Sequence, residues 1–106
     1  MAKYLICGSY TEEGLKGLLK EGGTKREEAT KQAVESMGGT LETYFFAYGD
    51  NDFYFVVDQP DNVNVIAGIL LANASGTVKL KTIPLITPVE VDEAVKKTMD
   101  WRPPGQ

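Results

Sequence analysis

Histidine is absent from this sequence of 106 residues, and cysteine and tryptophan occur once each. Without histidine the chain cannot build a Ser-His-Asp or Cys-His catalytic arrangement, a histidine-ligated haem or a zinc site with histidine ligands. The single cysteine, Cys7, permits neither a disulfide within the chain nor an all-cysteine metal site. We therefore expect no metal and no cofactor, and a reducing, cytoplasmic location.

Basic residues are also scarce, since 11 Lys and Arg stand against 15 Asp and Glu, which gives a net charge of −4. A surface that tracks nucleic-acid phosphates needs clustered Lys and Arg, and here the lysines are scattered. No apolar run is long enough to span a bilayer, and none resembles a signal peptide. We expect neither nucleic acid nor a membrane as a partner. The hydrophobic fraction of 42% is that of a folded globular domain, and the length fits one domain.

The first half of the sequence predicts a strand, a broken helix and a hairpin. Residues 3–10 are rich in aromatic and branched residues, as strands are, whereas residues 11–38 have charged, helical spacing. Gly22 and Gly23 interrupt the helical pattern, and a capping box from Thr24 to Glu27 restarts it. Arg26, in that first turn, is expected to be a solvated surface charge.

Residues 41–48 and 53–58 alternate as strands, and the first run places Leu41 and Phe45 on one face and Tyr44 on the other. The stretch Gly49 to Asp52 between them predicts a tight turn, because Gly, Asn and Asp tolerate positive φ.

The second half predicts a helix, a strand and a further helix. Asp61 or Asn62 caps the first helix. Its expected core-facing stripe consists of Val63, Ile66, Ala67, Leu70, Leu71 and Ala74. Residues 77–86 alternate as a half-exposed strand, and a capping box at Thr87 to Glu90 opens a short helix through about Met99.

The resulting order, β-α-β-β-α-β with an added C-terminal helix, predicts an α+β fold of ferredoxin-like topology, with an antiparallel sheet and both helices on one face. Residues 1–99 form the single domain and residues 100–106 a C-terminal tail. Because apolar side chains occupy both faces of the strands, we expect a second copy of the chain to cover the other face, in a homodimer or higher oligomer.

Several short motifs resemble the GYD-domain family. They are Gly-Ser-Tyr-Thr-Glu-Glu-Gly at residues 8–14, Gly38-Gly39, Gly49-Asp-Asn-Asp-Phe53, Pro60-Asp61 and Thr87-Pro88. Asn51 stands where the family's Gly-x-Tyr-Asp stretch has tyrosine. The resemblance implies a small bacterial or archaeal protein of the dimeric α/β barrel superfamily, whose biochemical activity is unsettled.

Aromatic residues are dense in the expected sheet. Tyr10, Tyr44, Tyr48 and Tyr54 are predicted to line a site for a flat hydrophobic small molecule, each fixing the ligand through its hydroxyl. The alternative is a dimer core with tyrosine hydroxyls at its rim, and aromatic enrichment at interfaces favours it.

Without histidine, a general base has to be a carboxylate or a tyrosine with a shifted pKa. The candidates are Asp52, Tyr48 and Tyr10, with Asp58 a further carboxylate. Asp50 and Asp52 also offer oxygen ligands to a hard cation, but hairpin carboxylates more often bind the local backbone, so no metal site is predicted.

Two functions remain open. The first is a homo-oligomeric module that binds a small molecule or has a structural or regulatory role, which we favour because no acid, base and nucleophile converge in the sequence. The second is a cofactor-independent enzyme, of the monooxygenase or isomerase type, that acts on a hydrophobic aromatic compound.

Overall fold

Strands and helices follow one another in the predicted order, ending in an additional helix. The computed structural model describes residues 2–106. Its elements are β1 (Ala2–Tyr10), α1 (Glu12–Ser36), β2 (Thr40–Phe46), β3 (Phe53–Gln59), α2 (Asn62–Ala74), β4 (Val78–Leu85) and α3 (Pro88–Ala94). The α+β, ferredoxin-like fold is therefore confirmed, and α3 ends at Ala94 rather than near Met99.

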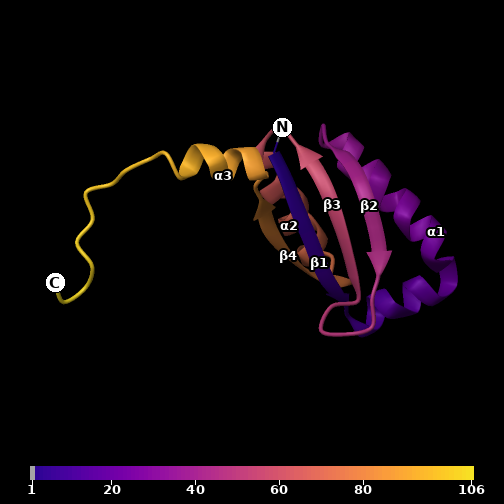
Figure 1. Ribbon diagram of the computed structural model, residues 1–106. Coiled ribbons are helices and arrows are strands. Elements are labelled where there is room, and N and C mark those ends of the chain that lie inside the picture. Colours follow the sequence, from indigo (N-terminus) through magenta and orange to yellow (C-terminus); the bar gives the residue numbers. More distant parts are fainter. Residues whose placement is uncertain (1) are drawn as a thin grey trace.

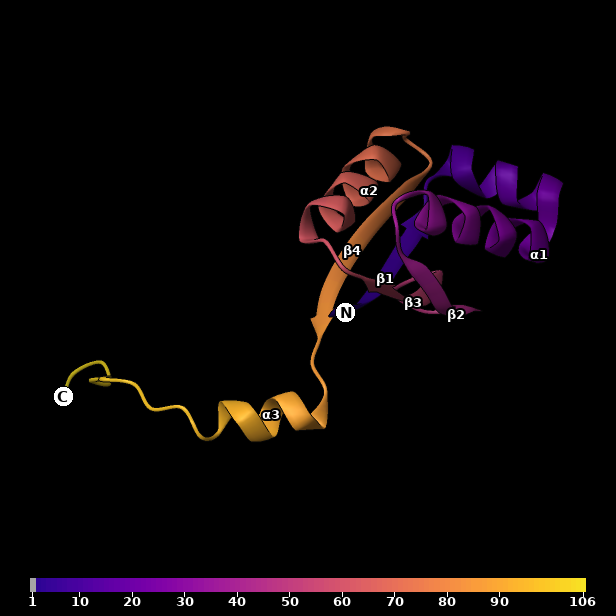
Figure 2. The same ribbon diagram turned by 90° about the horizontal axis from the view of Figure 1, so that it is seen from above.

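The four strands form one sheet in the order β2-β3-β1-β4, and every neighbouring pair is antiparallel. Helices α1 and α2 both pack on one side of it, as expected, with α1 over β2 and α2 over β4 (Figures 1 and 2). We call the opposite side the open face, because no helix of residues 2–106 packs on it.

The hydrophobic core lies on the helix side of the two central strands. Its buried members are Tyr4, Ile6, Phe53, Phe55 and Val57. They alternate along β1 and β3, because successive side chains of a strand point to opposite faces. Gly8 of β1 lies opposite Phe53 and Leu80. A Cβ at Gly8 would stand 2.7 Å from a Leu80 methyl and 2.8 Å from the Phe53 ring, so only glycine fits there.

Strand β2 departs from the predicted alternation. Its pairing with β3 skips one residue between Leu41 and Thr43, which leaves Glu42 as a bulge. Leu41 lies opposite Val57 and Tyr44 opposite Phe55, so both side chains join the core side. The prediction that Leu41 and Tyr44 point to opposite faces is therefore wrong, because one extra residue reverses the alternation beyond it.

Helix α1 is two helical pieces joined at a sharp bend. The break is at Gly22, whose φ of +81° is the left-handed conformation that glycine adopts without strain. The first piece leaves the end of β1, and the second turns back and runs along β2 (Figures 1 and 2). The predicted interruption at Gly22 and Gly23 is confirmed.

Helix α2 presents a different face from the predicted one. Val65 and Ile69 pack against the core, whereas Val63, Ile66 and Leu70 are exposed. The expected stripe was wrong because α2 is apolar around most of its circumference, so the spacing of apolar residues could not identify the inward side. The N-cap is Asp61, whose carboxylate accepts a hydrogen bond from the Val63 N–H at 2.8 Å.

The β2–β3 hairpin is present, but its loop is not a positive-φ turn. Among residues 2–106 positive φ occurs only at four glycines, Gly22, Gly38, Gly76 and Gly105. The loop is held by hydrogen bonds instead, from the Ala47 N–H to the Asp52 carbonyl and from the Asp52 N–H to the Gly8 carbonyl, both 2.8 Å. The predicted hairpin is confirmed, whereas its expected turn conformation was wrong.

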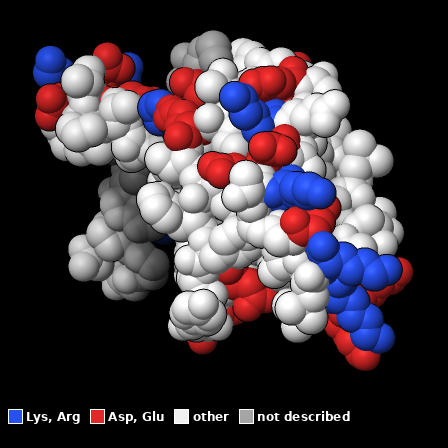
Figure 3. All heavy atoms as spheres, turned by 90° about the vertical axis from the view of Figure 1, so that its right-hand side faces the viewer, with Lys and Arg blue, Asp and Glu red and all other residues white. Residues whose placement is uncertain are grey.

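Residues 86–106, here called the C-terminal arm, extend away from the rest of the molecule (Figure 1). Seen from above, α3 lies on the side of the sheet opposite to α1 and α2, and the chain continues outward past β4 (Figure 2). Acidic and basic side chains are interspersed over the α1 side of the molecule (Figure 3).

Candidate functional site

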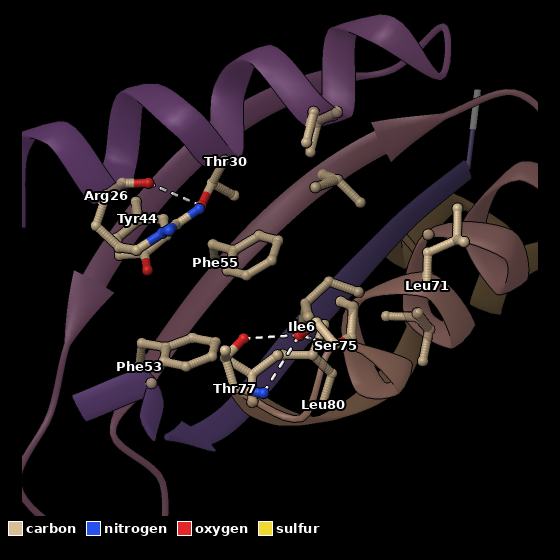
Figure 4. Close-up of a pocket in the computed structure, with 18 of the residues that line it drawn as sticks. Ile6, Arg26, Thr30, Tyr44, Phe53, Phe55, Leu71, Ser75, Thr77 and Leu80 are labelled. Carbon is tan, nitrogen blue, oxygen red and sulfur yellow. Dashed lines mark hydrogen bonds between the residues drawn. The ribbon is translucent and has the colours of Figure 1, made fainter. Parts of the chain in front are cut away.

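The space between α1, α2 and the sheet contains a cavity of about 630 Å³. Figure 4 shows its construction: α1 and α2 stand apart, and Ile6, Phe53 and Phe55 lie on the sheet between them. Cavities of roughly 300–1,000 Å³ are typical of small-molecule sites. The helices thus form two walls of a ligand-sized trough whose floor is the sheet.

Three aromatic rings dominate the floor. Tyr44 and Phe55 face each other across β2 and β3 with ring centroids 5.4 Å apart and planes within 4° of parallel. Phe53 lies 6.1 Å from Phe55 and 6.2 Å from Tyr44, again with nearly parallel planes. Parallel rings held by neighbouring strands give a rigid apolar surface, which favours contact with a flat ligand.

The hydroxyl of Tyr10 is a polar group beside this aromatic surface. The Tyr10 ring packs against Phe53 at a centroid distance of 5.0 Å, and its hydroxyl oxygen is buried without a hydrogen-bond partner among the described residues. Burial, followed by the neighbouring Tyr44 hydroxyl, raises the pKa of Tyr10 above its usual range. Burial likewise raises the pKa of Tyr44. Both hydroxyls therefore keep their protons at neutral pH, and each has a hydrogen to donate to a bound molecule.

These pKa shifts predict a loss of stability in alkali. A tyrosine whose pKa is higher in the folded chain than the unfolded value of about 10 stabilises the fold fully below that pH, and this contribution falls as the pH rises above it. We expect Tyr10→Phe to reduce the alkaline loss in the free energy of unfolding by roughly 1 kcal/mol at about pH 11, allowing for partial solvent exposure. Urea titrations below and above pH ~10 measure this, and identical alkaline losses in both proteins would contradict it.

A second unpaired polar atom lies toward the other end of the trough. Gln59, at the end of β3, is only 3% exposed, and its Oε1 has no hydrogen-bond partner among residues 2–106. Phe53 and Gln59 are six residues apart on β3, which corresponds to about 20 Å of strand. An unpaired buried acceptor is costly, so a donor from a bound molecule would compensate it.

The bend of α1 contributes an ion pair to the cavity wall. Arg26 of the second helical piece donates to the Glu21 carboxylate of the first piece at 3.0 Å, and both side chains line the cavity. The expectation of a solvated surface Arg26 therefore holds only in part, because its side chain is about one third exposed. The pair links the two pieces of α1 directly beside the trough.

The four tyrosines predicted as ligand contacts do not share one location. Tyr10 and Tyr44 line the cavity. Tyr48 lies in the hairpin loop and is fully exposed, at 108% of its reference area. Tyr54 pairs with Cys7 and Phe45, which places it on the open face. Within one chain, only two of the four side chains reach the trough.

Asp52, one of the two acidic residues of the hairpin loop, has a structural partner. The Asp52 carboxylate accepts a hydrogen bond from the Tyr10 N–H at 2.9 Å, so it joins the loop to the end of β1. Asn51, at the position of the family tyrosine, donates to the Tyr54 hydroxyl at 3.1 Å. Within residues 2–106, no three Cys, Asp or Glu side chains converge as metal ligands.

Sequence reasoning did not identify Gln59 as a site residue. A glutamine at the end of a strand carries no recognisable motif, and its burial depends on the approach of α1 and α2. The available signal was the strict alternation of β3, which places Gln59 on the same face as Phe53, Phe55 and Val57. Reading that alternation one residue further would have placed a polar group on the core side.

The fold and the trough define an α+β domain with a ligand-sized space between sheet and helices. A family model described as the GYD domain matches residues 4–95, from β1 through α3, and the chain belongs to this family. Neither the curated proteins nor the solved structures contain a match to the chain. Across residues 2–106, no helix combines the length and the apolar character needed to cross a membrane.

Proposed function

We propose that this GYD-domain protein is a self-associating module that binds a flat, largely apolar small molecule in the trough. The observation that carries the proposal is a 630 Å³ cavity with an aromatic floor and two buried polar atoms, Tyr10 Oη and Gln59 Oε1, that lack partners. Interior polar groups of folded proteins are nearly always paired, so this combination favours an occupant over an empty core.

The two unpaired polar atoms indicate which hydrogen-bonding groups the ligand carries. The protonated Tyr10 hydroxyl favours a hydrogen-bond acceptor, such as a carbonyl oxygen, lying over Phe53. Gln59 Oε1 favours a donor, such as a hydroxyl or amide group, on a ligand long enough to reach it. The cavity lining includes Glu13 and Glu21 as well as Arg26, so its net charge is −1, which disfavours an anion. The aromatic floor favours an uncharged aromatic compound.

Binding is better supported than catalysis. The raised pKa values of Tyr10 and Tyr44 keep these phenols protonated, so neither is prepared to act as a base near neutral pH. Asp52 is engaged with the backbone of Tyr10 and is not among the residues that line the cavity. The alternative of a cofactor-independent enzyme would require a base supplied by another group.

Filling the trough tests the proposal. Gly68 lies on α2 and lines the cavity, and a Cβ at this position would meet no atom within 4 Å beyond the adjoining backbone of its own helix. Gly68→Leu places a side chain in the free space and raises helix propensity by roughly 0.5–1 kcal/mol, so the fold is retained or stabilised. We expect at least a tenfold loss of affinity for the neutral fluorophore N-phenylnaphthylamine and loss of any small molecule released from the denatured wild-type protein.

The matched control is Ala74→Leu, which adds the same side chain at an exposed position of the same helix. It should leave both measurements unchanged. Fluorophore binding that is equal in wild type and Gly68→Leu, with both proteins folded by circular dichroism, would contradict a ligand site in the trough.

The self-association in this proposal rests on the open face. Leu5 of β1 pairs with Val56 of β3 and Ile83 of β4, so the three side chains form an apolar row across the sheet. Phe45 and Ile83 on this face are 68% and 46% exposed in the single chain. A contiguous apolar sheet surface of this kind favours burial against another copy.

A further inference from the structure

The C-terminal arm has no place to bury its apolar residues within its own chain. Every residue from Ile86 to Gln106 is exposed except Pro103, which is intermediate. The large exposed apolar side chains are Ile86, Val89, Val91, Val95, Met99 and Trp101, at 42–74% of their reference areas. Nevertheless α3 has a complete capping box at Thr87 and Glu90 and lies within the matched family domain, so the sequence specifies a helix here.

We infer that the arm of each copy clasps a second copy, with α3 lying against β4 on that copy's open face. This inference rests on the self-association proposed above and adds its geometry. The arm leaves β4 on the open-face side of the sheet and points away from its own body (Figure 2). A copy packed on the open face would therefore meet the arm, and two-fold symmetry would bring both arms into equivalent contacts.

The charges and the order of polar and apolar residues agree with this contact between α3 and β4. On the open face β4 presents Lys79 and Lys81, followed by Ile83 and Leu85, because these alternate with the helix-side residues Val78 and Leu80. Helix α3 carries three acids, Glu90, Asp92 and Glu93, and no base. Acidic and apolar residues on the helix thus meet basic and apolar residues on the strand, the complementarity expected of a specific contact.

Reversing the charges on β4 and on α3 tests the proposed contact between them. Lys79→Glu/Lys81→Glu makes the strand acidic, and Asp92→Lys/Glu93→Lys makes the helix basic while leaving the capping residue Glu90 intact. Each variant alone opposes like charges, so we expect its dimer dissociation constant to rise about tenfold, or roughly 1.4 kcal/mol, in analytical ultracentrifugation. When the two variants are mixed, both arm–strand contacts of a heterodimer become complementary, and dimer formation should return to the wild-type level.

Trp101 gives an independent readout, because it is the only tryptophan and lies in the arm. Its fluorescence should shift to shorter wavelength as wild-type protein is concentrated from monomer to dimer. Leu70→Glu, at an exposed apolar position of α2 on the other side of the sheet, is the control and should leave dimerisation unchanged.

The outcomes separate the two proposals. A wild-type protein that is monomeric by light scattering at high micromolar concentration overturns both self-association and the clasp. A dimer whose dissociation constant and Trp101 emission do not respond to either charge variant retains self-association but overturns the clasp. A dimer that is lost in Leu70→Glu and unaffected by Lys79→Glu/Lys81→Glu would overturn the proposed contact of α3 with β4.

Discussion

Replacing Gly14 by alanine should destabilise the protein by about 3 kcal/mol or more. Gly14 is buried in the first turn of α1, where a Cβ would stand 1.9 Å from the Thr77 carbonyl oxygen and 2.8 Å from its carbonyl carbon. Both atoms belong to the backbone, so no side-chain rotation relieves the overlap. Overpacking of this kind typically costs 1–3 kcal/mol and more where the backbone must move.

The overlap is severe because the two segments are also bonded together. The Thr11 N–H donates to the Thr77 carbonyl at 3.0 Å, and the Thr11 hydroxyl donates to the Gly76 carbonyl at 2.6 Å. Moving α1 away from Thr77 would stretch these bonds, which hold the start of α1 to the start of β4. The Gly-Ser-Tyr-Thr-Glu-Glu-Gly motif therefore has a packing role at both of its glycines, Gly8 and Gly14.

Gly17→Ala is the matched control for Gly14→Ala, one turn further along α1. Beyond the adjoining backbone of α1, no atom lies within 4 Å of a Cβ at Gly17, so the substitution should stabilise the helix by up to about 1 kcal/mol. Urea denaturation of both variants measures the difference. Equal stabilities of Gly14→Ala and wild type would show that α1 does not lie against Thr77.

The second large effect is expected from Phe53→Ala, at a cost of about 3–5 kcal/mol. Phe53 is 2% exposed, and its ring contacts those of Tyr10, Tyr44 and Phe55. Removing it enlarges the trough and leaves three neighbouring rings without support. Since a domain of this length has a total stability of roughly 5–15 kcal/mol, the variant would lose a large share of it, which urea denaturation measures.

Tyr48→Ala provides the comparison, because it removes a larger aromatic side chain that is fully exposed. The expected change in the free energy of unfolding is within about 0.5 kcal/mol. A Phe53→Ala cost as small as that of Tyr48→Ala would mean that the trough floor does not contribute to stability.

The order of the strands and helices was predictable because residues that cap or interrupt a helix mark where the helices begin and bend. Asp61, Thr87 and Gly22 act through neighbouring backbone groups, which are present in the sequence itself. The inward face of α2 was not predictable in the same way, since Val63 and Val65 differ only in what lies beside them. Only the packed sheet distinguishes the two sides of a helix that is apolar on both.

The candidate site was predictable in its chemistry but less in its position. Tyr10 and Tyr44 were identified as aromatic residues with hydroxyls, and both line the trough. Tyr44 reaches the trough because of the bulge at Glu42, and no pattern in the sequence predicted that bulge. Gln59 and the Arg26–Glu21 pair depend on the bend of α1 and the approach of the helices, which are consequences of tertiary packing.

The bend at Gly22 also determines how much of the sheet one helical segment can cover. A straight α-helix of the 25 residues from Glu12 to Ser36 would be about 37 Å long, whereas the seven residues of β2 extend about 23 Å. An unbroken rod would overshoot the sheet and leave its far end in water. Because the chain bends at Gly22, the first piece of α1 also lines the trough, with Glu13, Gly14, Gly17 and Leu18, so the position of a single glycine places both pieces of the helix beside the ligand space.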